Sequence, residues 1–150
     1  MSPVIATVIL VAVAITVAVA VAYWMGGIAS QYTKFEKIEI QSAVCTYGSG
    51  NWTIEMKLKN TGTATATLLS VFINDVEVDL YDQTGAVSGA WATSVNVTTA
   101  NTVLTSGQTL PVSIWIDSGK SGVTLSSGTT VNIKIHSAGG MDYIKLVELV

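Results

Sequence analysis

The sequence predicts an α+β protein in which a long N-terminal hydrophobic α-helix precedes an antiparallel β-sandwich. Residues 3–33 contain no charged side chain, and the first charge in the chain is Lys34. From about Phe35 onward, apolar and polar residues alternate, which is the period of a strand with one buried face. We therefore expect two parts: a hydrophobic assembly or transmembrane helix in residues 1–35, and a β-sandwich globular domain in residues 36–150.

The uncharged segment is long enough to cross a membrane. An apolar run of more than about 18 residues is typical of a membrane-spanning helix, and thirty helical residues reach about 45 Å. Val and Ala alternate here with a period of two, which is also the period of a strand, but strands seldom exceed about ten residues. Ser2 and Pro3 also favour a helix start, because serine is a common N-cap and proline is tolerated at the first helical position.

Small residues recur every four positions along this segment and form a ridge on the expected helix. Such a ridge lets helix backbones approach closely, which is how helices associate in an apolar environment. It indicates a helix that packs against copies of itself; the alternative is a single-pass anchor that is rich in alanine. The helix-packing residues are Ala14, Ala18, Ala22, Gly26 and Ser30.

A glycine pair and three aromatic residues mark the end of the segment. Gly26 and Gly27 each weaken a helix by about 1 kcal/mol relative to alanine, so they predict a bend or local melting, or else a close-packing contact. Tyr23, Trp24 and Tyr32 would lie at the water interface of a membrane, or at the junction of helix and globular domain in a filament.

The opening segment, Ser2 to Thr16, resembles the N-terminal segment of archaeal type IV pilins, which are close kin of the archaellins. Bacterial relatives have a glutamate near the start of the helix; Ile5 stands there in this chain, which fits the archaeal branch. The resemblance implies a short charged leader, the class III signal peptide, that a prepilin peptidase removes before the pilus assembly machinery adds the helix to a filament core. Nothing basic precedes Pro3, so we expect either the processed form or a start at Met1 with a different export signal.

The rest of the chain consists of short predicted strands between turns. The clearest is residues 52–60, where Trp52, Ile54, Met56 and Leu58 alternate with polar residues. About seven to nine such strands indicate an immunoglobulin-like architecture. Segments 52–63 and 71–74 also resemble adhesion and cell-surface β-sandwich modules of archaeal exported proteins. The predicted strands are 36–47, 52–60, 66–73, 76–80, 95–97, 110–117, 131–135 and 143–150, and residues 82–92 are left unassigned.

The composition and motifs argue against nucleic-acid binding and catalysis. A net charge of −3 provides no basic face for nucleic acid. His136 is the only histidine and lacks the partners of a zinc site. Cys45 is the only cysteine, so it forms no intramolecular disulfide, and we expect it to be a small buried residue. Asp75, Asp79 and Asp82 lack the spacing of a calcium loop. We expect no catalytic residues, no cofactor and no metal.

Two sequons predict N-glycosylation. They begin at Asn51, in a glycine- and serine-rich turn, and at Asn96. We favour Asn51, because a turn is accessible to a glycosyltransferase. Glycans would also compensate for a surface with few charges.

These observations predict a structural subunit that polymerises through its helix into an extracellular adhesion pilus at the cell surface. The helix would wait in the membrane before assembly. Two alternatives remain: a membrane-anchored, monomeric β-sandwich that binds a surface partner, and an archaellin of a motility filament.

Overall fold

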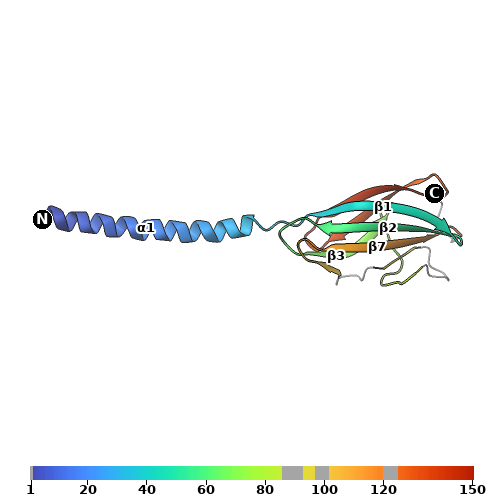
Figure 1. The fold of residues 1–150 in the computed structure, drawn as a ribbon, viewed down its shortest axis with the longest axis horizontal. Helices are drawn as coiled ribbons and strands as arrows, with labels where there is room; N and C mark the ends of the chain where they lie inside the picture. Colours follow the sequence, from blue (N-terminus) through green and yellow to red (C-terminus); the bar gives the residue numbers. More distant parts are fainter. Residues whose placement is uncertain (1, 86–92, 97–101, 120–124) are drawn as a thin grey trace. The chain divides into compact units, whose positions relative to one another are not determined.

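The structure, a computed structural model, describes residues 2–85, 93–96, 102–119 and 125–150. The chain forms two compact units, Met1–Phe35 and Glu36–Val150. The first contains a single helix, α1 (Pro3–Tyr32), and the second contains nine strands among its described residues (Figure 1).

Helix α1 begins where the sequence predicts it. Ser2 occupies the N-cap position with extended backbone angles (φ −68°, ψ 132°), and Pro3 follows in the first turn. The Ser2 side chain makes no capping hydrogen bond, so serine contributes here through its backbone alone. At the other end Thr33 is the C-cap, and its N–H donates to the Ala29 carbonyl over 3.1 Å.

The second unit is a sandwich of two antiparallel sheets, which confirms the predicted fold class. One sheet, called sheet A here, has the order β1-β2-β7-β5, and the other, sheet B, has the order β4-β3-β8-β9, with β6 paired to β3. Figure 1 shows the long strands β1, β2 and β7 lying side by side. Sheet A contains β1 (Ile38–Gly48), β2 (Asn51–Asn60), β7 (Thr109–Asp117) and β5 (Thr93–Val95); sheet B contains β4 (Val76–Glu77), β3 (Ala66–Ile73), β8 (Thr130–Ser137), β9 (Asp142–Glu148) and β6 (Thr102–Leu104).

The hydrophobic core lies between the two sheets. Alternate residues of each long strand are buried, because successive side chains point to opposite faces of a sheet. The alternation predicted for the strands around Trp52, Ile114 and Ile133 is confirmed, since these residues are at most 4% exposed. All core residues lie between Ile38 and Leu149, and none of the residues of α1 is buried.

Three short strands differ from the sequence-based prediction. The predicted strand 76–80 is reduced to Val76–Glu77, because Asn74 (φ 49°) and Asp75 (φ 64°) make a tight turn from β3 into a strand that pairs for two residues only. The strand predicted at 95–97 is Thr93–Val95, and Asn96 follows it, still hydrogen-bonded to Ser113 of β7. Val97 lies outside the described residues. Strand β6 was not predicted, because three residues are too short for a periodic signal.

Candidate assembly surface

Helix α1 presents an uncharged apolar surface along its whole length. It is long and apolar enough to cross a membrane. Its large side chains are exposed in the single chain, including Leu10 (70%) and Val19 (63%). An exposed apolar surface of this extent is unfavourable in water, so it requires a cover of lipid or protein.

Three aliphatic hydroxyl groups of this helix donate to carbonyls of the helix itself. The Thr7 hydroxyl donates to the Pro3 carbonyl over 2.7 Å, and the Thr16 hydroxyl donates to the Ala12 carbonyl over 2.8 Å. The Ser30 hydroxyl donates to the Gly27 carbonyl over 2.8 Å. No lipid or protein partner is needed for these hydroxyls, so they do not oppose burial in an apolar medium.

The small residues of the predicted ridge are all exposed along α1. The ridge comprises Ala14, Ala18, Ala22, Gly26 and Ser30. Rows of residues spaced by four are inclined by about 26° to the axis of a helix. A second helix that packs along such a row therefore crosses α1 at an angle, and its backbone approaches closely where the side chains are small.

A shallow hollow lies over Gly27. It has a volume of ≈ 280 Å³ and is lined by Tyr23, Trp24, Gly27, Ile28 and Gln31. A Cβ atom added at either Gly26 or Gly27 would meet nothing within 4 Å. No close contact with a described residue therefore requires either glycine. The helix is continuous through the pair, and the bend predicted at Gly26 and Gly27 stays a prediction.

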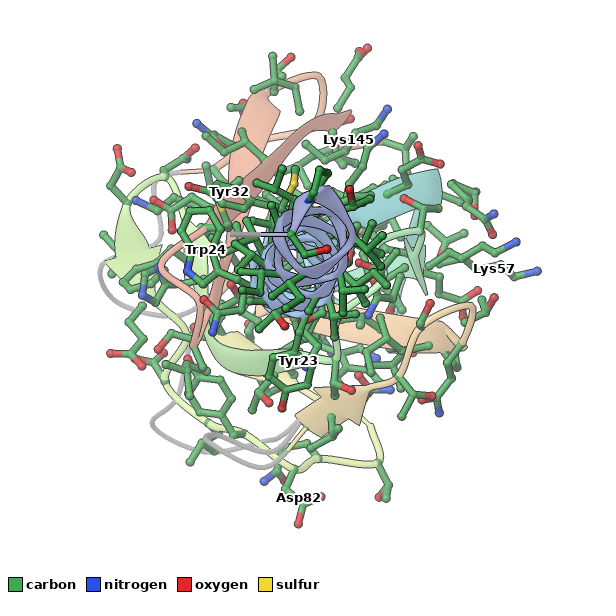
Figure 2. The ribbon with its side chains drawn as sticks, turned by 90° about the vertical axis from the view of Figure 1, so that its left-hand side faces the viewer. Tyr23, Trp24, Tyr32, Lys57, Asp82 and Lys145 are labelled. Atoms are coloured by element: carbon green, nitrogen blue, oxygen red, sulfur yellow. The ribbon has the colours of Figure 1, made fainter. Side chains whose placement is uncertain are left out.

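The aromatic residues near the end of α1 project outward. Tyr23, Trp24 and Tyr32 are 87%, 66% and 84% exposed. Figure 2 shows Trp24 and Tyr32 toward one side of the helix and Tyr23 toward another. The three aromatic side chains thus do not form one stripe along the helix.

The two sequons differ in how firmly their asparagine side chains are bound. Asn51 is the first residue of β2 and follows the tight turn Ser49–Gly50. Its amide makes one long hydrogen bond, 3.5 Å, to the Ser49 carbonyl. Asn96 instead accepts a 2.9 Å hydrogen bond from the Ser113 N–H and donates over 3.5 Å to the Pro111 carbonyl. Its sequon partner Thr98 lies outside the described residues.

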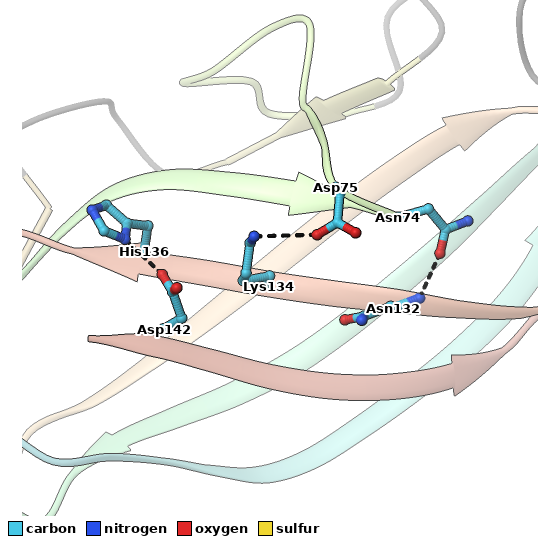
Figure 3. A network of polar contacts seen from close by, with 6 residues as sticks. All are labelled: Asn74, Asp75, Asn132, Lys134, His136 and Asp142. Carbon is cyan, nitrogen blue, oxygen red and sulfur yellow. Dashed lines mark hydrogen bonds and ion pairs between the residues drawn. The ribbon is translucent and has the colours of Figure 1, made fainter. Parts of the chain in front are cut away.

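The described residues contain no group of three or more metal-ligating side chains. His136 lies on the outer face of β8, and its Nδ1 is 2.6 Å from Asp142 Oδ1 (Figure 3). Cys45, predicted to be buried, is only half-buried against the core, because it lies on the edge strand β1.

The three aspartates that might suggest a calcium site have separate surroundings. Asp75 accepts a 3.2 Å hydrogen bond from Lys134, as Figure 3 shows. Asp79 accepts hydrogen bonds from the Thr93 N–H and hydroxyl at 3.0 and 3.1 Å. Asp82 is exposed and has a φ of 58°. The structure does not bring these carboxylates together in a metal-ligating group.

The first residue of the sandwich unit is bound to the turn between β8 and β9. The Tyr143 hydroxyl donates to Glu36 Oε1 over 3.3 Å. A Cβ at Gly139 would lie 2.5 Å from Glu36 Oε2, so the absence of a side chain there makes room for the carboxylate. Burial, with the nearby Glu36 charge, raises the pKa of Tyr143 above its ordinary value. Sequence reasoning missed this contact, because no local pattern links residues 107 positions apart.

Comparison with known proteins places the chain in no family. No family model and no curated protein matches it. One similar solved structure is the secreted serine protease VesC from Vibrio cholerae, at 15% identity and a TM-score of 0.45; the match covers 81% of this chain and 24% of that chain. Another is the Iho670 flagellar-like filament, at 12% identity and a TM-score of 0.40, covering 99% of this chain and 98% of that chain. Both similarities are too distant to indicate a function for this chain.

Proposed function

We propose that this chain is a structural subunit that polymerises through α1 into an extracellular filament of the archaeal type IV pilus kind. Two observations together support the proposal: the 30-residue helix is uncharged and none of its residues is buried, and the core of the second unit includes no residue of that helix. The helix is therefore free to be covered by something other than its own domain.

Before assembly, lipid would cover α1. A helix of thirty residues spans about 45 Å, whereas the hydrocarbon core of a bilayer is about 30 Å thick. Part of the apolar surface would then extend beyond the hydrocarbon. In a filament core, neighbouring helices would cover the whole length, and lipid contacts would be exchanged for protein contacts at little net cost.

The composition of α1 favours the filament over a monomeric anchor. An anchor needs only apolar length, and leucine serves that purpose well, but Leu10 is the only leucine in α1. The helix instead has a row of small residues, and two glycines that no contact with a described residue requires. Close approach of other helices would explain both features.

The remaining parts of the proposal follow from the resemblance of residues 2–16 to archaeal type IV pilins. A prepilin peptidase would process the precursor, and the pilus assembly machinery would transfer it from the membrane to the filament. The sandwich would form the outer surface and act in adhesion, with a glycan at Asn51. We assign it no enzymatic role.

Electron microscopy of sheared surface material tests the proposal. Cells that express the chain are sheared, and the released material is labelled with an antibody against residues 36–150 and negatively stained. We expect antibody along the length of filaments. If the chain stays in the membrane fraction and no filament is labelled, it is the monomeric anchor. Labelled filaments that rotate on tethered cells would make it an archaellin.

A further inference from the structure

Strand β9 presents an apolar pair between two carboxylates on the outer face of sheet B. Its alternation places Asp142, Ile144, Leu146 and Glu148 outward, opposite the outward residues of β8. Ile144 and Leu146 are 56% and 62% exposed, although both are large aliphatic residues. We call these four residues the β9 patch.

The charges of β8 beside this patch are bound to other residues. Lys134, opposite Ile144, lies 3.2 Å from Asp75 and 5.0 Å from the centre of the Phe72 ring. His136, opposite Asp142, lies 2.6 Å from it, as Figure 3 shows. Glu148 makes no ion pair with any described residue, so the distal end of the β9 patch is acidic.

A second surface, on the outer face of sheet A, has the opposite charge. Lys57 and Lys59 point outward from β2. Leu58, which lies between them, and Met56, which precedes Lys57, are both buried. Neither lysine makes an ion pair with a described residue. The exposed Val44 and Pro111 lie on the neighbouring strands. We call Val44, Lys57, Lys59 and Pro111 the β2 patch.

The carboxylates nearest the β2 patch do not cancel its charge. Glu39, opposite Lys59, is bound to Lys37 at 3.2 Å, so that pair is neutral. Glu55 is one outward position along β2 from Lys57, and it offsets one of the two lysines. The β2 patch is therefore positive overall and partly apolar, which complements the acidic, apolar β9 patch.

Edge-to-edge pairing of sheets is disfavoured on this side of the sandwich. Lys145 lies on the inward side of the edge strand β9, opposite the fully buried Ile133. A charge on the inward side of an edge strand disfavours the addition of another strand to the sheet. The other nearby edge, β1, has a register shift between Ile40 and Ser42. A second copy that approaches here therefore makes contact through the faces of the sheets.

We propose that the β9 patch of one copy binds the β2 patch of the next copy in the filament. The partner is a second copy of this chain, and the inference rests on the proposed function. A filament requires a heterologous contact, in which two different surfaces of the same chain meet and the contact repeats without closing. The two patches meet this requirement, because they lie on different sheets, differ in charge, and each expose apolar side chains.

A charge exchange in the full chain tests the pairing. Lys57→Glu should place its new carboxylate near Glu148 of the next copy. The amount of the chain in sheared filaments should then fall about tenfold. Glu148→Lys should do the same, and the double variant Lys57→Glu with Glu148→Lys should return filaments to the wild-type level. Protease resistance of the membrane-held chain establishes that each variant folds.

The apolar part of the contact has its own test. Ile144→Ser with Leu146→Ser should also reduce filaments about tenfold, because burial of two aliphatic side chains is lost. The matched control is Val76→Ser on β4, which is 70% exposed but lies outside both patches; it should leave filaments unchanged. Absence of wild-type filaments would overturn the proposed function itself. Wild-type filaments with unaffected single variants, or single defects that the double variant does not repair, would overturn this pairing.

Discussion

The side-chain amide of Asn60 donates a 2.8 Å hydrogen bond to the carbonyl of Leu104 and thereby joins the two sheets of the sandwich. Asn60 ends β2 in sheet A, whereas Leu104 ends β6 beside β3 in sheet B. The same amide donates over 2.8 Å to Ala64, and its oxygen accepts from the Gly62 N–H over 2.9 Å. Asn60 is fully buried, and its hydrogen bonds with Leu104 and Gly62 are shielded from water, whereas the bond to Ala64 is partly buried.

We predict that Asn60→Ala destabilises the sandwich by about 3 kcal/mol. The substitution removes the side-chain donor from the Ala64 and Leu104 carbonyls, and a buried unsatisfied polar group costs about 1–3 kcal/mol. The Gly62 N–H keeps its second acceptor, the Lys37 carbonyl at 3.2 Å. Chemical denaturation of the full chain in detergent, followed by tryptophan fluorescence, measures the effect. The control is Lys57→Ala on the same strand, whose exposed side chain should change stability by less than about 0.5 kcal/mol. Equal stabilities of the two variants would contradict the role of Asn60.

The sequence predicts some of these features better than others. Helix α1 and strand β2 were predicted because each is long and has one clear pattern: an uncharged run in α1 and strict alternation from Trp52 to Leu58 in β2. From the sequence, Asn60 is predicted only as the last residue of the strand 52–60. Its side chain is hydrogen-bonded to Leu104, 44 positions away, and no local pattern encodes a contact over that distance.

The two parts of the candidate assembly surface also differ in how far the sequence predicts them. The spacing of small residues in α1 is local and was visible in the sequence. The β9 patch also follows from alternation, once β9 is known to be an edge strand. That position depends on the order of strands in sheet B, which is set by packing between distant segments. The contacts that we propose for both surfaces lie between copies, so the fold of one chain positions the residues without supplying their partners.

We predict that residues 36–150 fold without the helix. The core contains only residues of this range, so removal of residues 1–35 leaves the buried set intact. The fragment should be soluble, resist proteolysis and unfold in one cooperative transition, as expected for a single small domain. Circular dichroism during a thermal ramp is the measurement. A collapsed, protease-sensitive product would mean that the sandwich depends on the helix or on neighbouring copies.

We predict that the sandwich loses stability above about pH 10. Burial raises the pKa of Tyr81 above its ordinary value of 10.0, with a further rise from its hydrogen bond to Glu77 and an opposing contribution from the Val71 N–H. The folded state therefore retains this proton at a pH where the unfolded chain releases it. This stabilisation is fully present below pH 10 and is lost as the pH rises through the folded pKa.

Tyr81→Phe separates this contribution from the titration of the lysines. The variant should be less stable at neutral pH, because the Val71 N–H loses its 3.1 Å acceptor. Between about pH 9.5 and about pH 11, the free energy of unfolding of the variant should nevertheless decrease less steeply than that of the wild type. Denaturation midpoints measured across that range give the pH dependence of stability for the wild type and for the variant. Parallel curves would show that Tyr81 does not contribute to the alkaline loss.

We predict that the chain in filaments is heavier than its sequence and that Asn51 is the N-linked site. Asn51 begins β2 after a tight turn, and its side chain makes a single long hydrogen bond, whereas Asn96 is bound to β7 through both polar atoms. Intact mass of filament protein, with Asn51→Gln as the variant, tests this. Asn96→Gln is the matched control and should leave the mass shift in place. A wild-type mass equal to that of the bare chain would contradict the prediction.

We predict that Ala18→Phe abolishes or fragments the filaments. Ala18 lies in the small-residue ridge between Ala14 and Ala22, and a phenyl ring there would push neighbouring helices apart. Overpacking of a filled interior costs about 1–3 kcal/mol per site, and every subunit of a polymer has the same substitution. Membrane insertion should survive, because phenylalanine is favourable in lipid. The measurement compares the amount of the variant chain in sheared filaments with its amount in the membrane fraction.

Val17→Leu is the control for this variant, since it adds one methylene group beside the ridge and not on it. It should affect filaments less than Ala18→Phe, although a core that is crowded on all sides would reduce the contrast. A monomeric anchor predicts no effect of Ala18→Phe, because lipid adapts to a larger side chain. Normal filaments and normal surface display in that variant would therefore refute packing along the ridge. The anchor would then be the better explanation of an uncharged helix joined to a complete sandwich.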